Sequence, residues 1–319
     1  MVVGVPEKSG NGPATLTSAA ARGQAAGRRS SAHAGAATVR TPDAVAGAAQ
    51  LACVLEVSAE KPGNITPSHN FDDTSYEDML CSGIALGPEL GRAGERGVGE
   101  TVLTAVRASR GAAGANTNLG IALLLAPLAR AALGTGGGSL RERLANVLRA
   151  LTVEDARDAY AAIRVAGPGG LDEPVEHDVR AEPRVTLREA MAAAAQRDTI
   201  ASEYVTDHAV TFELGLSTLT DSLGDGLRPR DAIVELALCL LAAVPDTLIA
   251  RKRGAEAADR VSAGARRVLA AGGVRNAGGW TALAEFDASL REDGNALNPG
   301  TTADLVTSVL FVALLEGVL

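Results

Sequence analysis

The stretch E-V-S-A-E-K-P-G-N-I-T-P-S-H-N-F-D-D-T-S-Y-E-D, residues 56–78, is a polar interruption between two apolar, helix-like segments. Its Lys61-Pro62-Gly63-Asn64 turn cannot continue a helix, because proline lacks an amide proton and glycine and asparagine tolerate left-handed geometry. Carboxylates, a histidine and a lysine gather in the same stretch, together with two aromatic residues. A flexible linker is usually simpler in composition. We therefore predict a loop that carries chemistry and is held in place by helices.

The same pattern of apolar helix and polar elbow repeats outward from this loop. A Thr-Pro-Asp start at 41–43 predicts a helix to about residue 58, and a capping sequence at 75–78 predicts another to about residue 91. Further helices are expected at about 99–110, 121–133, 140–150, 152–164, 187–223 with a break near 198, 230–243, 255–271, 280–292 and 302–317. Alternating runs of β-branched residues, which indicate strands, do not occur. The predicted fold class is all-α: a single compact multi-helix bundle whose polar loops form one pocket.

Composition divides the chain into two parts. Residues 1–42 are rich in Gly, Ala, Ser and Arg without a sustained apolar period, which predicts a disordered N-terminal tail. This composition is also typical of an organelle transit peptide. Residues 43–319 are predicted to form one all-helical domain that carries the chemistry. With 46% hydrophobic but only 3% aromatic residues in the whole chain, small aliphatic side chains must fill its core.

Charge and cysteine content restrict the partners. The 319-residue chain has a net charge of −8, and because residues 1–42 carry +4, the remainder carries −12. An acidic body argues against nucleic acid as a partner, whereas it suits divalent cations that bridge carboxylates to phosphates. Three separated cysteines without a CxxC pair favour a reducing, cytoplasmic location. The longest apolar runs, 119–133 and 305–319, are shorter than the roughly 20 residues that span a bilayer, so we expect core helices and no membrane partner. The oligomeric state stays open.

Acidic, amide and other polar residues recur where the helices are expected to break. They are Glu56, Lys61, Asn64, His69, Asp72, Asp73, Asn116, Asn118, Asp198, Asp246, Asn298, Thr301 and Asp304. Each alone can be read as a helix cap or a turn residue. Together, at successive ends of a bundle, they can converge on one pocket, and their oxygen atoms are ligands that suit Mg²⁺ beside substrate phosphates. His69 and His177, both in polar loops, are candidate acid–base groups. Neither a P-loop nor a G-x-S-x-G motif occurs.

At these residues the sequence resembles the triphosphoribosyl-dephospho-CoA synthase family, the all-helical enzymes associated with citrate lyase and malonate decarboxylase. The resemblance covers about 43–317 and rests on the order and spacing of six motifs. They are E-V-S-A-E-K-P-G-N (56–64), F-D-D with Y-E-D-M (71–79), N-T-N-L-G (116–120), R-D-T-I-A-S-E-Y (197–204), P-D-T-L-I-A-R-K-R-G (245–254) and N-P-G-T-T-A-D-L (298–305). The family reaction that this implies uses ATP as a substrate. The 2′-hydroxyl of dephospho-CoA attacks C1′ of the ribose, and adenine leaves.

The resemblance also implies roles for individual residues. Positive charge builds up on the ribose as adenine leaves, so a carboxylate would stabilise it and another base would take the hydroxyl proton. The candidates for these catalytic roles are Asp72, Asp73, Glu56 and His69. The candidates for binding substrate and phosphate are Lys61, Asn64, Asn116, Asn118, Arg251, Lys252, Asn298 and Thr301. The candidates for holding Mg²⁺, which would neutralise the triphosphate, are Asp198, Asp246 and Asp304.

Two departures from the family pattern leave alternatives open. The sequence H-N-F-D-D-T-S-Y-E-D-M stands where citrate-lyase members carry N-G-S-H-x-D-M, and T-N-L-G lacks the basic residue of the T-x-x-K/H-G segment. In this the chain resembles a divergent branch found in archaea and in bacteria with methanopterin-type one-carbon metabolism. One alternative is therefore a related nucleotide- or phosphate-dependent enzyme of methanopterin- or methanofuran-type cofactor assembly. The other is a noncatalytic helical binding protein, whose aspartates would cap helices separately.

Overall fold

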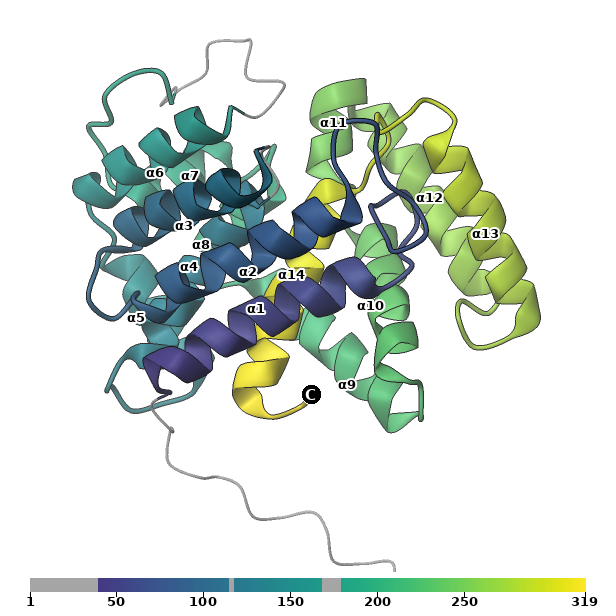
Figure 1. Cartoon of the computed structure of the whole chain (residues 1–319), viewed down its shortest axis with the longest axis horizontal. Coiled ribbons are helices and arrows are strands. Elements are labelled where there is room, and N and C mark those ends of the chain that lie inside the picture. Colours follow the sequence, from purple (N-terminus) through teal and green to yellow (C-terminus); the bar gives the residue numbers. More distant parts are fainter. Residues whose placement is uncertain (1–39, 115–117, 168–178) are drawn as a thin grey trace, which may run out of the picture. The chain divides into compact units, whose positions relative to one another are not determined.

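The described part of the chain is helical throughout. The computed structural model describes residues 40–114, 118–167 and 179–319, which belong to one compact unit (Figure 1). Within those ranges there are fourteen α-helices and one π-helix, and the only β pairing is an isolated bridge between Thr66 and His69. The all-α prediction is therefore confirmed. Most of the predicted tail, Asn116 and His177 lie outside the described residues.

The helix bounds follow local sequence signals at many points. In chain order the elements are α1 (Pro42–Ser58), α2 (Tyr76–Gly91), α3 (Val98–Ala113), α4 (Leu119–Leu133), α5 (Leu140–Arg149), α6 (Val153–Ala166), α7 (Leu187–Ala194), α8 (Thr199–Val205), the π-helix η1 (Val210–Gly215), α9 (Leu216–Gly224), α10 (Pro229–Ala243), α11 (Thr247–Arg253), α12 (Ala255–Ala270), α13 (Ala277–Arg291) and α14 (Gly300–Glu316). Thr41 caps α1 through its side chain, and Ser75 and Asp78 form a reciprocal capping box at α2, as the sequence predicts.

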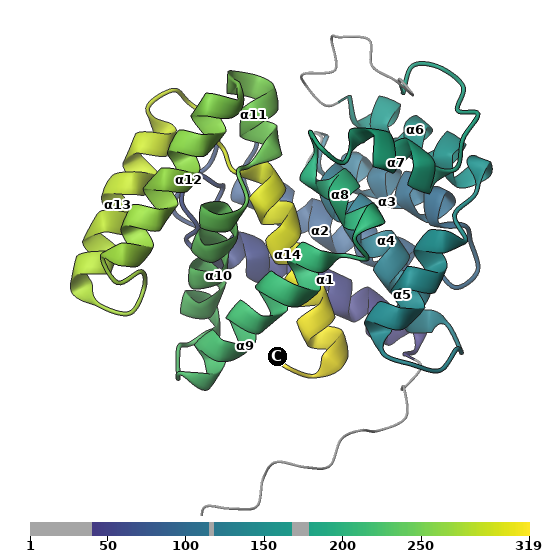
Figure 2. The same cartoon turned by 180° about the vertical axis from the view of Figure 1, so that it is seen from behind.

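Helix α14 is the central element. It packs against α1, α4 and α10, and in both views it runs between the group α2–α8 and the group α9–α13 (Figures 1 and 2). Most of its side chains are buried, as are those of α4. These are the two long apolar runs of the sequence, so their prediction as core helices is confirmed. The first turns of α14 therefore lie where both groups of helices can reach them.

Small residues allow close helix packing, which agrees with the prediction that small side chains fill the core. On α2, Gly83, Gly87 and Gly91 recur every four residues and so share one face. A methyl group on Gly83 would lie 2.7 Å from Cβ of Cys53, and one on Gly87 would lie 2.4 Å from Cγ of Gln50. These contacts with α1 leave no room for a side chain, so α1 and α2 pack with their backbones close together.

The structure departs from the predicted helices in two places. The region 187–223 breaks twice, once at Asp198 and again at a turn where Asp207 and His208 both have positive φ, after which η1 begins. His208 is fully buried and burial lowers the pKa of its imidazole to about 3, so it is a neutral core residue. The second departure is an additional short helix. Residues 247–253, which were not predicted to be helical, form α11. Both Cys53 and Cys81 lie on apolar helical stretches, which predicts buried thiols; Cys53 is buried, but Cys81 is exposed.

The loop between α1 and α2 docks on α13. The backbone N–H of Gly63 donates to Oδ1 of Asp287 at 2.7 Å, and Arg291 donates to the carbonyl oxygen of Asn64 at 2.8 Å. Arg291 and Asp287 also form an ion pair at 2.8 Å. The polar loop is thus fixed from outside by a helix that is more than 200 residues away in sequence.

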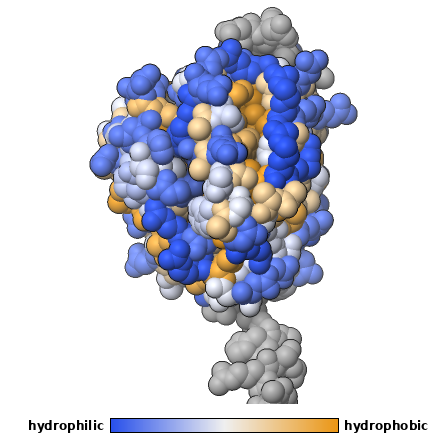
Figure 3. Space-filling view, turned by 90° about the vertical axis from the view of Figure 1, so that its right-hand side faces the viewer, coloured by the Kyte–Doolittle hydropathy of each residue, from blue (hydrophilic) through white to orange (hydrophobic). Residues whose placement is uncertain are grey.

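No single helix in the described ranges is both long and apolar enough to cross a membrane; α10 and α11 together meet the length and composition criteria, but a bend of 56° separates them. The side of the molecule on which α12 and α13 lie is mostly hydrophilic, with small apolar patches (Figure 3). The apolar residues of α10 are largely buried against α12, α9 and α14. The apolar character of α10 is thus accounted for by core packing.

Substituting Gly63 with alanine should destabilise the protein more than the same change at Gly114. Both glycines have similar positive φ values, 72° and 71°, so both variants incur backbone strain of about 1–2 kcal/mol. Only at Gly63 would the new methyl group also collide, at 2.9 Å from Cδ1 of Leu290. We expect roughly 1–3 kcal/mol of additional loss in the free energy of unfolding from this overpacking, measured by urea denaturation. Equal losses at the two sites would contradict the tight docking of the loop.

Candidate active site

A large cavity of about 1510 Å³ lies where several helix ends meet. Its lining includes the last turn of α1 and the first residues of α4, α8, α11 and α14. In Figure 1, α7 and α8 lie to the left of the N-terminal end of α14, α12 lies to its right, and α11 lies above it. Helix N-termini carry unpaired N–H groups and a partial positive charge, so their convergence favours an anionic ligand.

The cavity brings together most of the residues predicted from the sequence. Those that line it are Glu56, Asn64, Asp73, Asp198, Arg251, Lys252, Asn298, Thr301 and Asp304. Those that lie outside its lining are Lys61, His69, Asp72, Asn118 and Asp246. The second group falls into two kinds, buried structural residues and exposed loop residues.

Asp246 joins the starts of two helices. Its Oδ1 accepts hydrogen bonds from the backbone N–H groups of Leu248 and Ile249 at 2.9 and 3.1 Å, which caps α11. Its Oδ2 accepts from both the N–H and the hydroxyl of Thr302 at 2.8 Å, which holds the first turn of α14. Burial raises the pKa of this carboxyl, although the four hydrogen bonds oppose the rise. Because both oxygens are already occupied by protein donors, the structure argues against the metal-binding role predicted for Asp246.

Threonine hydroxyls extend this junction to α8. The hydroxyls of Thr247 and Thr301 lie 3.2 Å apart, and that of Thr247 accepts from the N–H of Thr199 at 3.3 Å. Asp198 caps α8 with one carboxylate oxygen, and its other oxygen accepts from Arg251 at 3.0 Å. The starts of α8, α11 and α14 are therefore tied into one polar unit beneath the cavity.

Replacing Asp246 with alanine should cost clearly more stability than replacing Asp198. Each aspartate caps one helix, a contribution of about 1 kcal/mol. Asp246 also holds a second helix through two buried hydrogen bonds from Thr302, whereas Asp198 contacts a second helix only through one partly exposed ion pair with Arg251. We expect roughly 3 kcal/mol or more for Asp246→Ala, because buried donors lose their acceptor. Thermal and urea unfolding of both variants measure the difference. Comparable losses would mean that Asp246 is only a helix cap.

Glu56 and Lys61 form a buried ion pair at the cavity wall. Nζ of Lys61 lies 2.9 Å from Oε1 of Glu56 and also donates to the carbonyl oxygens of Glu56 and Ala59. The Lys61 side chain has no exposed surface, so the phosphate contact predicted for it is not supported. Its three ammonium donors instead fix the end of α1. No described residue donates a hydrogen bond to Oε2 of Glu56. Glu56 itself lines the cavity.

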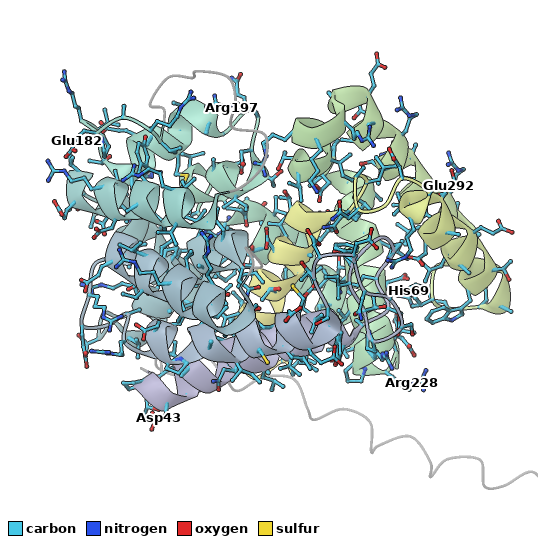
Figure 4. All side chains as sticks on the ribbon, turned by 45° about the horizontal axis from the view of Figure 1, so that its top comes forward. Asp43, His69, Glu182, Arg197, Arg228 and Glu292 are labelled. Carbon is cyan, nitrogen blue, oxygen red and sulfur yellow. The ribbon has the colours of Figure 1, made fainter. Side chains whose placement is uncertain are left out.

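Three further predicted residues lie apart from the cavity. Asn118 is buried, and its side-chain amide donates to the hydroxyls of Ser82 and Ser109 at 2.9 and 3.0 Å. It therefore ties α2 and α3 to the start of α4 rather than reaching a ligand. His69 and Asp72 are exposed on the α1–α2 loop, where Figure 4 labels His69. The catalytic roles predicted for these two residues are not supported by their positions, whereas Asp73 does line the cavity.

Asp304, on the second turn of α14, is the least satisfied carboxylate of the cavity. No described residue donates a hydrogen bond to it or forms an ion pair with it, in contrast to Glu56, Asp198 and Asp246. Burial raises its pKa well above the ordinary value of 3.8, and repulsion by these three neighbouring carboxylates adds to the rise. Arg251 opposes the rise. Asp304 is only partly exposed, and a carboxylate in such surroundings without a partner among the described residues lowers stability, which is typical of functional groups.

Asp304→Asn should therefore be more stable than the wild type at neutral pH. A raised folded-state pKa means that the folded protein binds more protons than the unfolded chain, so the aspartate loses stability as pH rises above about 4. The amide removes this loss, and each kcal/mol regained should raise the melting temperature by roughly 2–4 °C. Melting curves from pH 4 to pH 8 measure the effect, which should shrink toward the acidic end. A variant less stable than wild type at pH 8 would contradict this placement of Asp304.

Several residues of the cavity were not identified from the sequence. Arg197 lines it and, with Arg251 and Lys252, supplies its positive charge; burial and then Arg251 lower the pKa of Lys252 (Figure 4 labels Arg197). Gly120 lets Asp304 approach α4, because a methyl group there would lie 2.0 Å from Oδ2 of Asp304. Gly120 ends the N-T-N-L-G motif, which was a usable signal, whereas the position of Arg197 next to a predicted cap does not by itself indicate a cavity residue.

The carboxylate oxygens of the cavity could hold a metal ion only together with oxygen atoms of a bound ligand. Among the described residues, no group of three or more His, Cys, Asp or Glu side chains is arranged to hold a metal ion. Mg²⁺ at phosphate sites is usually held by one or two carboxylates together with the phosphates and water. Asp73, Asp304 and Oδ2 of Asp198 supply oxygen atoms of this kind along the cavity wall, since this Oδ2 accepts one hydrogen bond, from Arg251, whereas each oxygen of Asp246 accepts two. They would suit an ion shared with a phosphorylated ligand.

Comparison with known proteins gives a consistent result. A 2-(5″-triphosphoribosyl)-3′-dephosphocoenzyme-A synthase of Klebsiella pneumoniae is 26% identical over 236 residues, which cover 73% of this chain and 72% of that protein. A probable enzyme of the same name from Stutzerimonas stutzeri is 28% identical over 231 residues, 72% of this chain and 68% of that one. A crystal structure from Archaeoglobus fulgidus, titled as a triphosphoribosyl-dephospho-CoA synthase, is similar with a TM-score of 0.58 and 30% identity, covering 75% of this chain and 99% of that one. Residues 42–319 match the family described as ATP:dephospho-CoA triphosphoribosyl transferase, and the chain belongs to this family.

Proposed function

We propose that this protein transfers the triphosphoribosyl group of ATP to the 2′-hydroxyl of dephospho-CoA and releases adenine. The observation that carries the proposal is the charge arrangement of a single cavity. Two carboxylates, Glu56 and Asp304, line it together with the cations Arg197, Arg251 and Lys252. Membership of the transferase family supplies the reaction, and the names of the relatives supply the acceptor.

The reaction breaks one bond and forms one bond at the same carbon. The C1′–N9 bond of ATP breaks, and its electron pair leaves with adenine. The 2′-hydroxyl oxygen of the acceptor bonds to C1′, and the hydroxyl proton is transferred to a base and finally to adenine. Positive charge develops on the ribose during this exchange, as in glycoside hydrolysis.

Glu56 and Asp304 suit two different parts of this chemistry. Lys61 neutralises and orients Glu56, so a fixed carboxylate can stabilise the cationic ribose. Asp304 has no hydrogen-bond donor among the residues that the structure describes, and its raised pKa makes it a stronger base than an ordinary aspartate. We assign the stabilising role to Glu56 and the removal of the hydroxyl proton to Asp304. Two carboxylates whose surroundings differ in this way commonly divide such roles.

The cationic side of the cavity would hold the triphosphate. Arg197 makes one hydrogen bond to the carbonyl oxygen of Ala193, and Lys252 makes only a long one, 3.4 Å, to that of Asn295. Both side chains therefore keep donors for phosphate oxygens. ATP would enter as its Mg²⁺ complex, in which the ion neutralises phosphate charge, and Asp73 and Asp198 are the carboxylates that would complete its coordination.

The two alternative functions make different demands on the same cavity. A noncatalytic protein would need its aspartates only as separate helix caps; Asp198 and Asp246 are caps, but Asp304 caps no helix. A related enzyme of one-carbon cofactor assembly would use the same nucleotide side with another acceptor. The choice of acceptor therefore distinguishes the leading proposal from this relative.

Incubation with Mg²⁺, ATP and dephospho-CoA should release free adenine, measured by liquid chromatography. The product should have the mass of dephospho-CoA joined to a triphosphoribosyl group. Adenine release only with a different acceptor would shift the function to another member of this reaction class. No adenine release with any phosphorylated or nucleotide acceptor would rule out the proposed reaction.

Asp304→Asn and Glu56→Gln should each lower kcat by roughly 10²–10⁴-fold, the usual contribution of a positioned base or charge stabiliser. Asp43→Asn is the matched control, because Asp43 lies at the opposite end of α1 from Glu56 and is exposed (Figure 4). It should retain wild-type activity. In the wild type, kcat should rise with pH through a pKa above the ordinary aspartate range, because Asp304 must be ionised to act as the base. An unchanged kcat in Asp304→Asn would contradict this role.

A further inference from the structure

The cavity has an uncharged arm on the side of α6 and α7. The residues that these two helices contribute to its lining are Tyr160, Ile163, Leu187, Ala190, Met191 and Ala194. None of them carries a charge, whereas the lining just before α8, on α11 and at the start of α14 contains charged residues. We refer to the part of the cavity lined by these six residues as the apolar arm.

The apolar arm is continuous with the proposed reaction site. Ile200, at the start of α8, lines the cavity, and its Cδ1 would lie 2.7 Å from a methyl group on Gly120. The same methyl group would lie 2.0 Å from Oδ2 of Asp304. Ile200 and Asp304 thus both lie beside Gly120, and the six residues of the apolar arm line the same cavity as these two.

The volume of the cavity exceeds the needs of one small ligand. A single drug-sized molecule usually occupies about 300–1,000 Å³, and this cavity has about 1510 Å³. Two substrates must also be present together for the proposed transfer. The charged part is sufficient for the triphosphate and the reacting sugar, which leaves the apolar arm for a neutral portion of one substrate.

The chemistry of the two substrates decides which one occupies the apolar arm. Phosphate groups would lose their hydration there without gaining a cation, which is costly. Adenine is the only large apolar part of ATP, and it is compact and leaves during the reaction. Dephospho-CoA carries in addition a long neutral chain of methylenes and amides, the pantetheine chain. An extended, uncharged wall suits this chain better than any other part of either substrate.

We propose that the apolar arm binds the pantetheine chain of the acceptor and thereby selects dephospho-CoA over shorter nucleotides. This inference rests on the proposed function, since it takes the acceptor from it. Ala190 and Met191 are the specificity-determining residues, because they lie side by side on α7 within the lining and are buried. Gln196, which lines the cavity beyond the end of α7, offers an amide for the amide groups of the chain.

The test is calorimetric binding of two ligands to the full-length protein and two matched variants. ADP is dephospho-CoA without its pantetheine portion, so it retains the adenosine and the diphosphate. Ala190→Phe fills the apolar arm and should weaken dephospho-CoA binding about ten-fold or more, while ADP binding should change less than about two-fold. Ala192→Phe is the control, because Ala192 is two residues along the same helix, exposed and outside the lining. It should bind both ligands as the wild type does.

The outcomes separate this proposal from the proposed reaction. Unchanged dephospho-CoA binding in Ala190→Phe, or an equal loss for both ligands, would overturn the role of the apolar arm even if adenine is released normally. If the variants show the predicted binding but adenine is not released, the role of the apolar arm is supported and the proposed reaction is contradicted. Melting curves show whether the variants fold. If Ala190→Phe does not fold, Met191→Ala, which removes contact surface without adding bulk, should weaken dephospho-CoA several-fold and leave ADP unchanged; equal binding of both ligands by this variant and the wild type would overturn the proposal.

Discussion

The buried carboxylate of Asp246 holds together the helix ends from which the site is built. It accepts four hydrogen bonds, two from the start of α11 and two from Thr302 on α14. A buried charge is tolerated only when it is hydrogen-bonded in this way. Because α14 is the central helix of the fold, fixing its first turn also fixes Asp304 one turn further on. The position of Asp304 in the cavity therefore depends on a residue that does not itself line the cavity.

The site combines two carboxylates whose surroundings differ. Glu56 has a buried lysine as its partner, whereas Asp304 has three carboxylates near it and no donor within residues 40–114, 118–167 and 179–319. The first arrangement keeps a negative charge in a fixed position, and the second keeps a group able to exchange a proton. The cations Arg197, from the turn between α7 and α8, and Arg251 and Lys252, from α11, line the same cavity as this pair, as does an uncharged wall from α6 and α7. Each part of a two-substrate transfer thus has a matching part of the cavity.

Local signals in the sequence were sufficient for most of the fold. Thr41 and the Ser75–Asp78 capping box set the starts of α1 and α2 as predicted, because a helix cap depends on a few neighbouring residues. The apolar run of α4 was also correctly predicted to be buried. Helix α11 was missed because it has only seven residues and follows Pro245-Asp246, which by itself reads as a break. The turn at Asp207 and His208 was not predicted, because it contains no glycine or proline.

The location of the candidate site could be predicted, but which of the polar side chains face the cavity could not. Polar residues at successive helix ends do gather at one cavity, because a bundle brings those ends together. Whether a given side chain faces the ligand or the core depends on contacts between distant segments. Lys61 binds Glu56 and Asn118 binds Ser82 and Ser109, so both are structural. Arg197 was overlooked, since a cation next to a cap gives no local sign that it lines a cavity.

A crystal structure of the Asp304→Asn variant with Mg²⁺ and ATP tests the central claim most directly, because this variant should bind ATP without turning it over. We expect triphosphate oxygens within hydrogen-bonding distance of Arg197, Arg251 or Lys252, and C1′ of the ribose between Glu56 and residue 304. ATP bound outside the cavity, or with its triphosphate directed into the arm between α6 and α7, would contradict it.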